Sequence, residues 1–257
     1  MKIVLIGAGN VATHIATALA KRDMAPVQVW SRTEESANTL AAKIGSQPVI
    51  DIVNIVDDAD IYIFSVVDKA LDAVVAEVCR HIKRGICVHT AGTMSMDVFA
   101  GRCTNYGVLY PMQTFSRQKE VDFSVIPCFV EASDRETLDQ ISCLAHLLSE
   151  RVYELSGDDR RWLHVAAVFA CNFSNACYAM ADHILKKHGL DFSVMLPLVD
   201  ETTGKLHRLE PVEAQTGPAA RKDYNVMDKH VAMLDNEPRL KEVYRLMSDM
   251  IIEQQNK

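Results

Sequence analysis

The sequence has no cluster of lysine and arginine residues, and its acidic residues outnumber its basic ones. It contains 27 Lys and Arg against 34 Asp and Glu, a formal net charge of −7 over 257 residues. Proteins that bind duplex nucleic acid usually carry a basic patch or stripe on their surface. We therefore expect no nucleic-acid partner.

The chain also has no uninterrupted apolar run of about 20 residues, which a transmembrane helix needs. The apolar stretch after Lys2 shares features with a secretory signal, but Gly7, Gly9, Asn10 and His14 interrupt it. Secretion is thus the weaker interpretation. We expect a cytoplasmic protein with no membrane partner.

No two cysteines form a C-x-x-C pair, and their number is odd. A disulfide framework normally uses an even number, and zinc sites normally use closely spaced pairs. We therefore expect reduced, mostly buried thiols that serve as small core residues, and no metal site. The seven residues are Cys79, Cys87, Cys103, Cys128, Cys143, Cys171 and Cys177.

Short apolar runs alternate with helical patterns over the first 155 residues. This alternation is typical of βαβ units and a parallel sheet. Strands are expected at 2–6, 27–30, 47–50, 61–67, 86–89, 106–110, 127–131 and 151–155, and helices at 10–22, 34–44, 69–83 and 134–150. Ser133 is expected to cap the last of these helices.

The pattern after Gly157 contains no strands. One long helix is predicted over 158–188, and apolar residues cover more than half of its surface. Such a helix is buried in a helical domain or against a partner chain. Further helices are predicted at 192–203, 223–234 and 238–254. The fold class is therefore α/β, with a doubly wound, mostly parallel Rossmann domain (1–155) followed by an all-α domain (156–257).

The hexapeptide GAGNVA at 7–12 lies between the first expected strand and the first expected helix. This is the context of a dinucleotide-binding fingerprint. The first glycine allows the tight turn, the second allows close approach of a pyrophosphate, and the third position needs only a small residue. The helix N-terminus supplies N–H groups to the anion. The predicted cofactor-binding residues here are Gly7, Ala8, Gly9, Asn10 and Val11.

The second strand ends at Trp30, where a protein that binds NAD usually offers an acid to the ribose 2′-hydroxyl. This chain has Ser31, Arg32 and Thr33 instead. Arg32 is suited to pair with a 2′-phosphate, and the two hydroxyls are suited to donate to it. The pattern favours NADP over NAD, although a solvated Arg32 and a helix-capping Thr33 would also account for it.

Two more loops follow strands at the same edge, where ligands bind in such sheets. Asp68 is expected to cap the helix after the first loop. His89, beside the second loop, is a candidate proton donor. A simple turn with capping hydroxyls would explain the residues of this loop equally well. The cofactor-binding candidates are Ser65, Val66 and Val67 on the first loop and Thr90, Ala91 and Gly92 on the second.

The long helix carries three polar residues, His164, Asn172 and Asn175, among its apolar ones. At about 100° per residue, His164 and Asn175 nearly share a face, and Asn172 lies within a quarter-turn of it. His164 is the predicted general acid/base and Asn172 the residue that orients the substrate. A satisfied core histidine is the alternative.

The segment TGPAARKD at 216–223 has a rigid Gly-Pro entry. Arg221 is suited to bind a substrate carboxylate through both guanidinium nitrogens. The alternative is a helix start that Asp223 caps, with His230 in a structural role.

Five stretches together resemble one family. They are GAGNVA, HTAGTMS at 89–95, LYPMQTF at 109–115, LHVAAVFACNF at 163–173 and TGPAARKD. They are similar to Rossmann-like proteins labelled NADP oxidoreductases, which carry a C-terminal domain of unknown function. The wider superfamily includes pyrroline-5-carboxylate reductase, prephenate dehydrogenase and 6-phosphogluconate dehydrogenase.

The resemblance implies NADP as cofactor and a helical domain that commonly mediates dimerisation, but no known substrate. It points to residues 7–12, 89–92 and 216–218 and to His164, Asn172, Arg221 and Asp223. The chain departs from its relatives in two places: Tyr110 stands where they often have histidine, and His164 replaces the lysine that several superfamily dehydrogenases use.

The sequence therefore favours an NADP-dependent oxidoreductase that transfers a hydride between nicotinamide and a small carbonyl, imine or hydroxy-acid substrate. We expect a homodimer through the helical domain. The alternative is a non-catalytic dinucleotide-binding sensor or partner-binding protein, which the missing lysine supports. A deazaflavin partner also stays open, since related Rossmann proteins reduce that cofactor.

Overall fold

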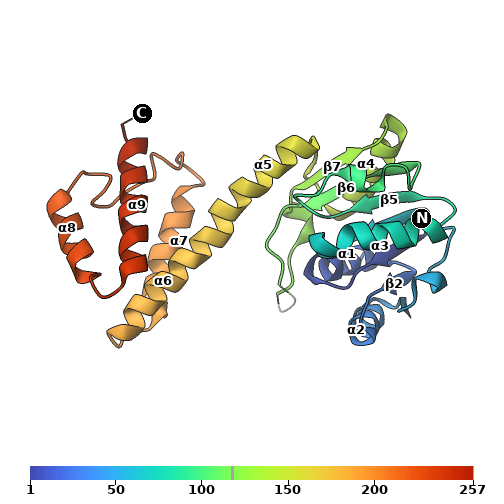
Figure 1. Cartoon of the computed structure of the whole chain (residues 1–257), viewed down its shortest axis with the longest axis horizontal. Coiled ribbons are helices and arrows are strands. Elements are labelled where there is room, and N and C mark those ends of the chain that lie inside the picture. Colours follow the sequence, from blue (N-terminus) through green and yellow to red (C-terminus); the bar gives the residue numbers. More distant parts are fainter. Residues whose placement is uncertain (117–118, 257) are drawn as a thin grey trace. The chain divides into compact units, whose positions relative to one another are not determined.

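The computed structural model describes residues 1–116 and 119–256 and divides the chain into two compact units, Met1–Cys171 and Asn172–Lys257 (Figure 1). The first unit contains every strand and the second is helical. The predicted domain boundary near residue 155 marks the end of the last strand. The division into compact units falls later, between Cys171 and Asn172.

The first unit is built on one eight-stranded sheet with the order β3-β2-β1-β4-β5-β6-β7-β8. All neighbouring strands are parallel except β6 and β7. The predicted doubly wound, mostly parallel sheet is thus confirmed. The strands are β1 (Ile3–Ile6), β2 (Gln28–Trp30), β3 (Gln47–Val49), β4 (Ile61–Phe64), β5 (Ile86–His89), β6 (Asn105–Pro111), β7 (Cys128–Ala132) and β8 (Val152–Glu154).

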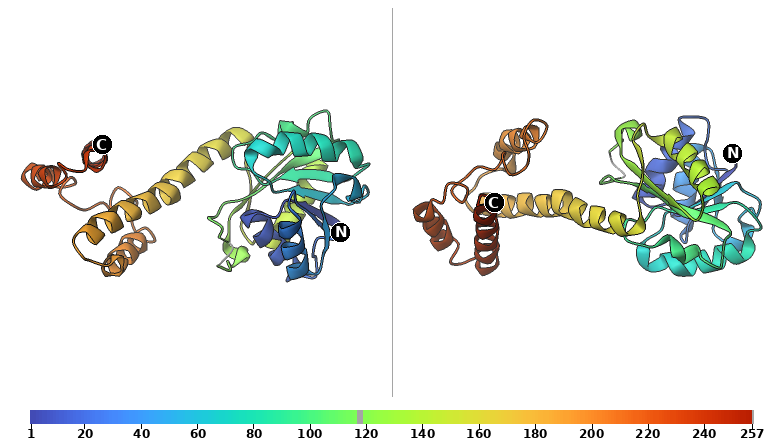
Figure 2. Two further views of the ribbon diagram at one scale, coloured as in Figure 1. Left: turned by 60° about the horizontal axis from the view of Figure 1, so that its bottom comes forward. Right: turned by 90° about the horizontal axis from the view of Figure 1, so that it is seen from above.

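Helices cover both faces of this sheet (Figure 2). Along β1, Ile3 and Leu5 pack with α1 (Asn10–Ala20), α2 (Glu34–Ile44) and α4 (Arg135–Leu148). Val4 and Ile6 pack on the other face with α3 (Asp68–His81) and the 3₁₀ turns η1 (Ile52–Asn54) and η2 (Met96–Phe99). Because both faces are buried, the strands read as continuous apolar runs rather than alternating ones.

Two predicted helix caps are wrong. Asp134, not Ser133, caps α4, because the Asp134 carboxylate accepts from the Thr137 backbone N–H at 2.9 Å. Asp68 is the first residue of α3 rather than its cap, and its carboxylate accepts from the Thr93 hydroxyl at 2.5 Å. The predicted strand at 61–67 ends at Phe64, since the chain turns there toward α3.

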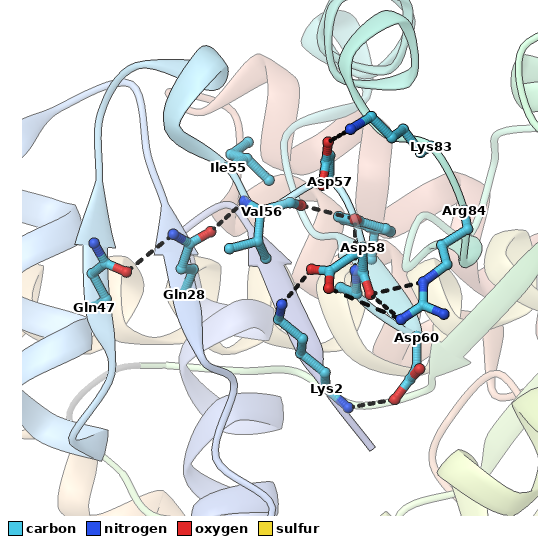
Figure 3. Close-up of polar contacts among 12 residues, drawn as sticks. Lys2, Gln28, Gln47, Ile55, Val56, Asp57, Asp58, Asp60, Lys83 and Arg84 are labelled. Atoms are coloured by element: carbon cyan, nitrogen blue, oxygen red, sulfur yellow. Dashed lines mark hydrogen bonds and ion pairs between the residues drawn. The ribbon is translucent and has the colours of Figure 1, made fainter.

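The amino ends of the strands are held by side-chain hydrogen bonds (Figure 3). The Gln28 amide donates to Gln47 Oε1 at 3.1 Å and accepts from the Val56 N–H at 2.8 Å. Asp57 pairs with Lys83 at 2.6 Å, and this contact lowers the pKa of the Asp57 carboxyl. The polar groups at the amino ends of β2 and β3 are therefore paired with the protein's own groups.

The second half of the chain is helical, as predicted, but the long helix expected over 158–188 is interrupted. A π-helical segment (Val168–Phe173) separates α5 (Gly157–Ala167) from α6 (Ser174–Lys187). None of the described helices is long and apolar enough to span a membrane. After α6 come η5 (Phe192–Met195), α7 (Leu196–Lys205), α8 (Tyr224–Met233) and α9 (Pro238–Gln254).

The second unit has little core of its own. Among its described residues only Leu185, Ala219 and Ser248 are buried. Large apolar side chains such as Leu198 and Met233 are 61% and 79% exposed. Of the described residues of the long helix, Arg160 and Leu185 are buried, so its expected burial within a helical domain is wrong for the single chain.

The cysteines are free thiols, as expected, but most are not buried. Only Cys87 and Cys128 are buried, because they lie on central strands of the sheet. The expectation of seven small core residues is wrong for the three exposed ones, which lie on helical surfaces. These are Cys143, Cys171 and Cys177.

Candidate functional site

The sheet order reverses between β1 and β4, and their carboxyl ends approach each other closely there. Gly7, just after β1, has φ +119°, a conformation that L side chains rarely adopt. A Cβ atom on Gly7 would lie 2.2 Å from the Ser65 carbonyl oxygen, just after β4. Only glycine fits here, and the crevice at such a reversal is where ligands bind in open α/β sheets.

A cavity of about 370 Å³ opens at this reversal point. Gly9 faces open space, so a ligand can approach its backbone closely. Trp30, Ser36, Ala70 and Val74 complete the lining and were not predicted. Of the predicted cofactor residues, Gly7, Ala8, Gly9, Ser31, Arg32, Thr33, Ser65, Val66 and Val67 line this cavity.

The other predicted cofactor residues do not line it. Asn10 donates from its side-chain amide to the Phe115 carbonyl oxygen at 2.9 Å, and so holds the loop after β6 against α1. Val11 packs against the core beneath α1. The Thr90 hydroxyl donates to the Ser65 hydroxyl at 3.1 Å. Through this bond the loops after β4 and β5 hold each other in place.

The charge of the cavity suits a phosphate better than a bare ribose hydroxyl. Arg32 is exposed beside Ser31 and Thr33, and Ser36 adds a hydroxyl on the first turn of α2. The described lining residues include no acid at the end of β2. An arginine surrounded by hydroxyls matches a phosphate dianion in charge and in hydrogen-bond donors.

A second cluster lies past the end of β5 and joins Gly92, Tyr110 and His164. The Tyr110 hydroxyl lies 3.2 Å from His164 Nδ1. A Cβ atom on Gly92 would lie 2.6 Å from that nitrogen and 3.1 Å from the tyrosine ring. The missing side chain of Gly92 therefore lets the imidazole and the phenol meet. Tyr110 is the residue that departs from the family's histidine, and here it contacts the predicted acid/base.

A buried ion pair fixes the helix that carries His164. Arg160, one turn earlier on α5, has a side chain 1% exposed and donates to Glu131 on β7 at 2.5 Å. It also donates to the Met94 carbonyl at 2.6 Å. The other Glu131 oxygen accepts from the Gly157 N–H, at the start of α5, at 2.8 Å. Residues four apart share a helix face, so this anchor sets the position of His164.

His89, the competing proton donor, is fully buried at the end of β5. Its Nδ1 accepts from the Ala91 N–H at 3.2 Å, and its ring stacks on Phe99. Burial, and then the positive charge of Arg160, lower the pKa of His89 to about 3. The imidazole therefore stays neutral at physiological pH, which favours a structural role over proton transfer to a substrate.

The remaining predicted residues belong to the second unit. Asn172 is exposed in the π-helical segment, and such segments often occur at functional sites. Arg221 is exposed, and Asp223 caps α8 by accepting from the Val226 N–H at 3.3 Å. His230 contacts the Tyr244 hydroxyl at 2.9 Å, which fits the structural role expected of it.

Sequence reasoning missed Arg160 and Glu131 as members of the site, and it noted Tyr110 only as a departure from the relatives' histidine. Arg160 is followed by a second arginine, and nothing in the sequence tells which of the two is buried. Glu131 offered a usable signal, because it is the one charged residue in an otherwise apolar strand. An acid in such a strand needs a partner.

Two family models match the chain. The model described as NADP oxidoreductase, coenzyme F420-dependent, matches residues 2–91. The model described as a domain of unknown function (DUF2520) matches residues 126–251. No curated protein matches the chain.

Solved structures of similar proteins cover nearly the whole chain. A protein described as a putative NADP oxidoreductase from Bacteroides fragilis is 47% identical, with a TM-score of 0.93 and 98% of each chain covered. A protein from Thermotoga maritima has 18% identity and a TM-score of 0.82, covering 99% of this chain and 100% of that one. An imine reductase from Myxococcus stipitatus, in complex with NADP⁺, has 15% identity and a TM-score of 0.68, covering 98% and 92%. At these identities the last two show a common fold.

The buried neutral His89 makes stability depend on pH. In the unfolded chain the pKa of His89 returns to 6.5. Between pH 6.5 and about pH 3 the unfolded state therefore binds a proton that the folded state does not bind. The free energy of unfolding should therefore fall as pH drops from 6.5 toward 3, by about 1.4 kcal/mol per pH unit from this group. His89→Asn should remove that part of the slope, as measured by urea unfolding at pH 7 and pH 5.

The control is His188→Asn, which removes an exposed histidine and should keep the wild-type slope. An equal slope in wild type and His89→Asn would contradict a folded-state pKa far below 6.5.

Proposed function

We propose that the chain, which belongs to the same family as the Bacteroides fragilis protein, is an NADP-dependent oxidoreductase. The proposed reaction transfers a hydride between the nicotinamide and a small carbonyl, imine or hydroxy-acid substrate. The observation that carries the proposal is the cavity at the β1–β4 reversal, which Gly7 makes possible and Arg32 makes positive.

The residues of this cavity fit NADP. Gly9 offers an open backbone at the N-terminus of α1, which suits a pyrophosphate. Ser31, Arg32, Thr33 and Ser36 offer a guanidinium and three hydroxyls to the 2′-phosphate. When bound, NADP supplies or accepts the hydride.

His164 is the proposed source of the proton that the substrate nitrogen or oxygen gains. Burial raises the pKa of Tyr110, so its hydroxyl stays protonated. A hydroxyl donates to neutral Nδ1 and accepts from protonated Nδ1, so the 3.2 Å contact persists in both states of the imidazole. Tyr110 thereby orients the ring and leaves Nε2 to exchange the proton with substrate.

Asn172 and Arg221 keep their predicted roles within this proposal. Asn172 would orient the substrate, and Arg221 would hold an acidic group on it. Imines are the first substrates to examine, because the Myxococcus stipitatus neighbour is an imine reductase. One similar structure is described as a putative NADP oxidoreductase and another as an imine reductase, which favours turnover over the alternative of a sensor.

A homodimer is the proposed assembly. The second unit exposes large apolar side chains, including Leu198, Met233 and Leu246, of which Leu246 is 60% exposed. A second copy of the chain would bury such side chains and complete the core that the single chain lacks.

Arg32→Ala should weaken NADPH binding and leave NADH binding nearly unchanged. Hydrogen bonds to a charged group contribute about 1.5–3 kcal/mol, so the expected loss is about 10- to 100-fold in NADPH affinity. Calorimetric titration with both cofactors measures this. Arg80→Ala removes an exposed arginine of α3 outside the cavity and serves as the matched control. Equal losses for NADPH and NADH would refute recognition of the 2′-phosphate by Arg32.

His164→Ala should lower turnover at least 100-fold while NADPH affinity stays within twofold, since general acid catalysis contributes about 10²–10⁴-fold. Tyr110→Phe should keep partial activity with a shifted pH profile, because it removes only the contact to Nδ1. NADPH oxidation is followed with a panel of cyclic imines, ketones with added amines, and 2-oxo acids. His146→Ala, an exposed histidine of α4, is the control. Unchanged turnover in His164→Ala would remove this residue from the mechanism.

Light scattering at micromolar concentration should give twice the chain mass of 28.6 kDa. The double variant Leu198→Glu and Leu246→Glu should be monomeric, because it places charge on the exposed apolar surface of the second unit. Val53→Glu changes a residue 68% exposed on the first unit and should leave the dimer intact. A monomeric wild type would overturn the proposed assembly.

A further inference from the structure

Three cysteines that are far apart in the sequence meet at the amino edge of the sheet. Cys79 lies on α3, Cys87 on β5, and Cys103 in the loop before β6. The distance from Cys79 Sγ to Cys103 Sγ is 3.0 Å, and that from Cys103 Sγ to Cys87 Sγ is 2.9 Å. All three sulfurs lie within 4.8 Å of one another.

This spacing is closer than packing alone requires. Uncharged heavy atoms pack best at about 3.5–4.0 Å, and sulfur is larger than carbon. A Zn²⁺ ion binds thiolates at about 2.3 Å in tetrahedral geometry, so three sulfurs around one ion lie about 3.8 Å apart. Small side-chain rotations would place these three around a single ion, because they already converge from three elements.

The chemistry of the three side chains also suits a cation. Zn²⁺ binds cysteine as the thiolate, so an ion that binds these three sulfurs displaces their protons.

The cluster has a path to solvent. Cys87 is buried, but Cys79 and Cys103 are only half-buried. A hollow of about 270 Å³ between the loops 82–85 and 102–105 has Cys103 in its wall. An ion can therefore enter, and a water molecule can complete the coordination from that side.

We propose that Cys79, Cys87 and Cys103 form a three-thiolate site for a thiophilic divalent cation, with Zn²⁺ the ion that this ligand set fits. Thiolate sets select such ions over Mg²⁺ and Ca²⁺. The site lies at the amino ends of β5 and β6, whereas the cofactor cavity lies at the carboxyl ends of β1 and β4. It is therefore independent of the proposed oxidoreductase function and differs from the sequence-based expectation of no metal site.

The test is a Cd²⁺ titration of the reduced full-length chain, followed by the thiolate-to-cadmium charge-transfer absorption. The starting protein carries Cys143→Ser, Cys171→Ser and Cys177→Ser, which remove the exposed thiols. The absorption should saturate at one equivalent of Cd²⁺. Zn²⁺ should compete with it, and Mg²⁺ should not.

Cys79→Ser and Cys103→Ser in this background should each weaken Cd²⁺ binding at least 100-fold. Mutation of a group that only orients a metal ligand already lowers metal affinity by about 10–100-fold, and the loss of a direct ligand should lower it no less. Cys128→Ala removes a buried thiol outside the cluster and is the matched control. Its affinity should equal that of the starting protein.

Circular dichroism without metal checks that each variant is folded. If Cys103→Ser does not fold, Cys79→Ser decides alone, because its thiol is half-buried on α3. The absence of a charge-transfer band in the reduced starting protein would overturn the proposal. Equal affinity in Cys79→Ser would overturn it as well. Neither result depends on NADP binding or on turnover.

Discussion

The close approach of Gly7 to the Ser65 carbonyl is the constraint on which the first unit depends. Because Gly7 has no side chain, β1 and β4 can stay side by side up to their carboxyl ends. The strand order reverses there, with β2 beyond β1 and β5 beyond β4. The loops after β1, β2 and β4 consequently surround one cavity. At the amino ends of β2 and β3, contacts such as those of Gln28 fill the space between the segments, whereas the carboxyl ends of β1, β2 and β4 border an open cavity.

A second constraint positions the chemistry. Arg160 and Glu131 bind each other in a buried pair, and Glu131 also receives the first N–H of α5. Removing Glu131 would leave the buried guanidinium of Arg160 without its counter-charge, which is costly, so the pair holds α5 firmly on the sheet. Gly92 then leaves room for His164 to reach Tyr110. The Arg160–Glu131 pair therefore fixes the position of His164, the proposed acid/base, and the contact with Tyr110 fixes the orientation of its ring.

Patterns local in sequence predicted the fold, and they singled out nine residues that the structure brings together around one cavity. The helix at 34–44 and the strand at 86–89 have the predicted limits, because each has clear apolar periodicity and a defined end. The GAGNVA turn and residues 31–33 meet in one cavity because the carboxyl ends of parallel strands share an edge.

What sequence reasoning missed depends on contacts between distant segments. Arg160 gains its role from Glu131, and the cysteine cluster forms from residues 79, 87 and 103, whose spacing resembles no short metal motif. The expected burial of the long helix failed for a different reason. Apolar residues of this helix such as Val165 are exposed in the single chain, and an apolar pattern alone does not say what covers them.

The central claim is that the carboxyl edge of the first unit binds NADP. Hydrogen–deuterium exchange of the full chain, with and without saturating NADPH, tests it most directly. The account predicts slower amide exchange in residues 7–12, 31–36 and 65–70, with little change at the amino edge of the sheet. Unchanged exchange in all three segments, or protection confined to the second unit, would contradict it.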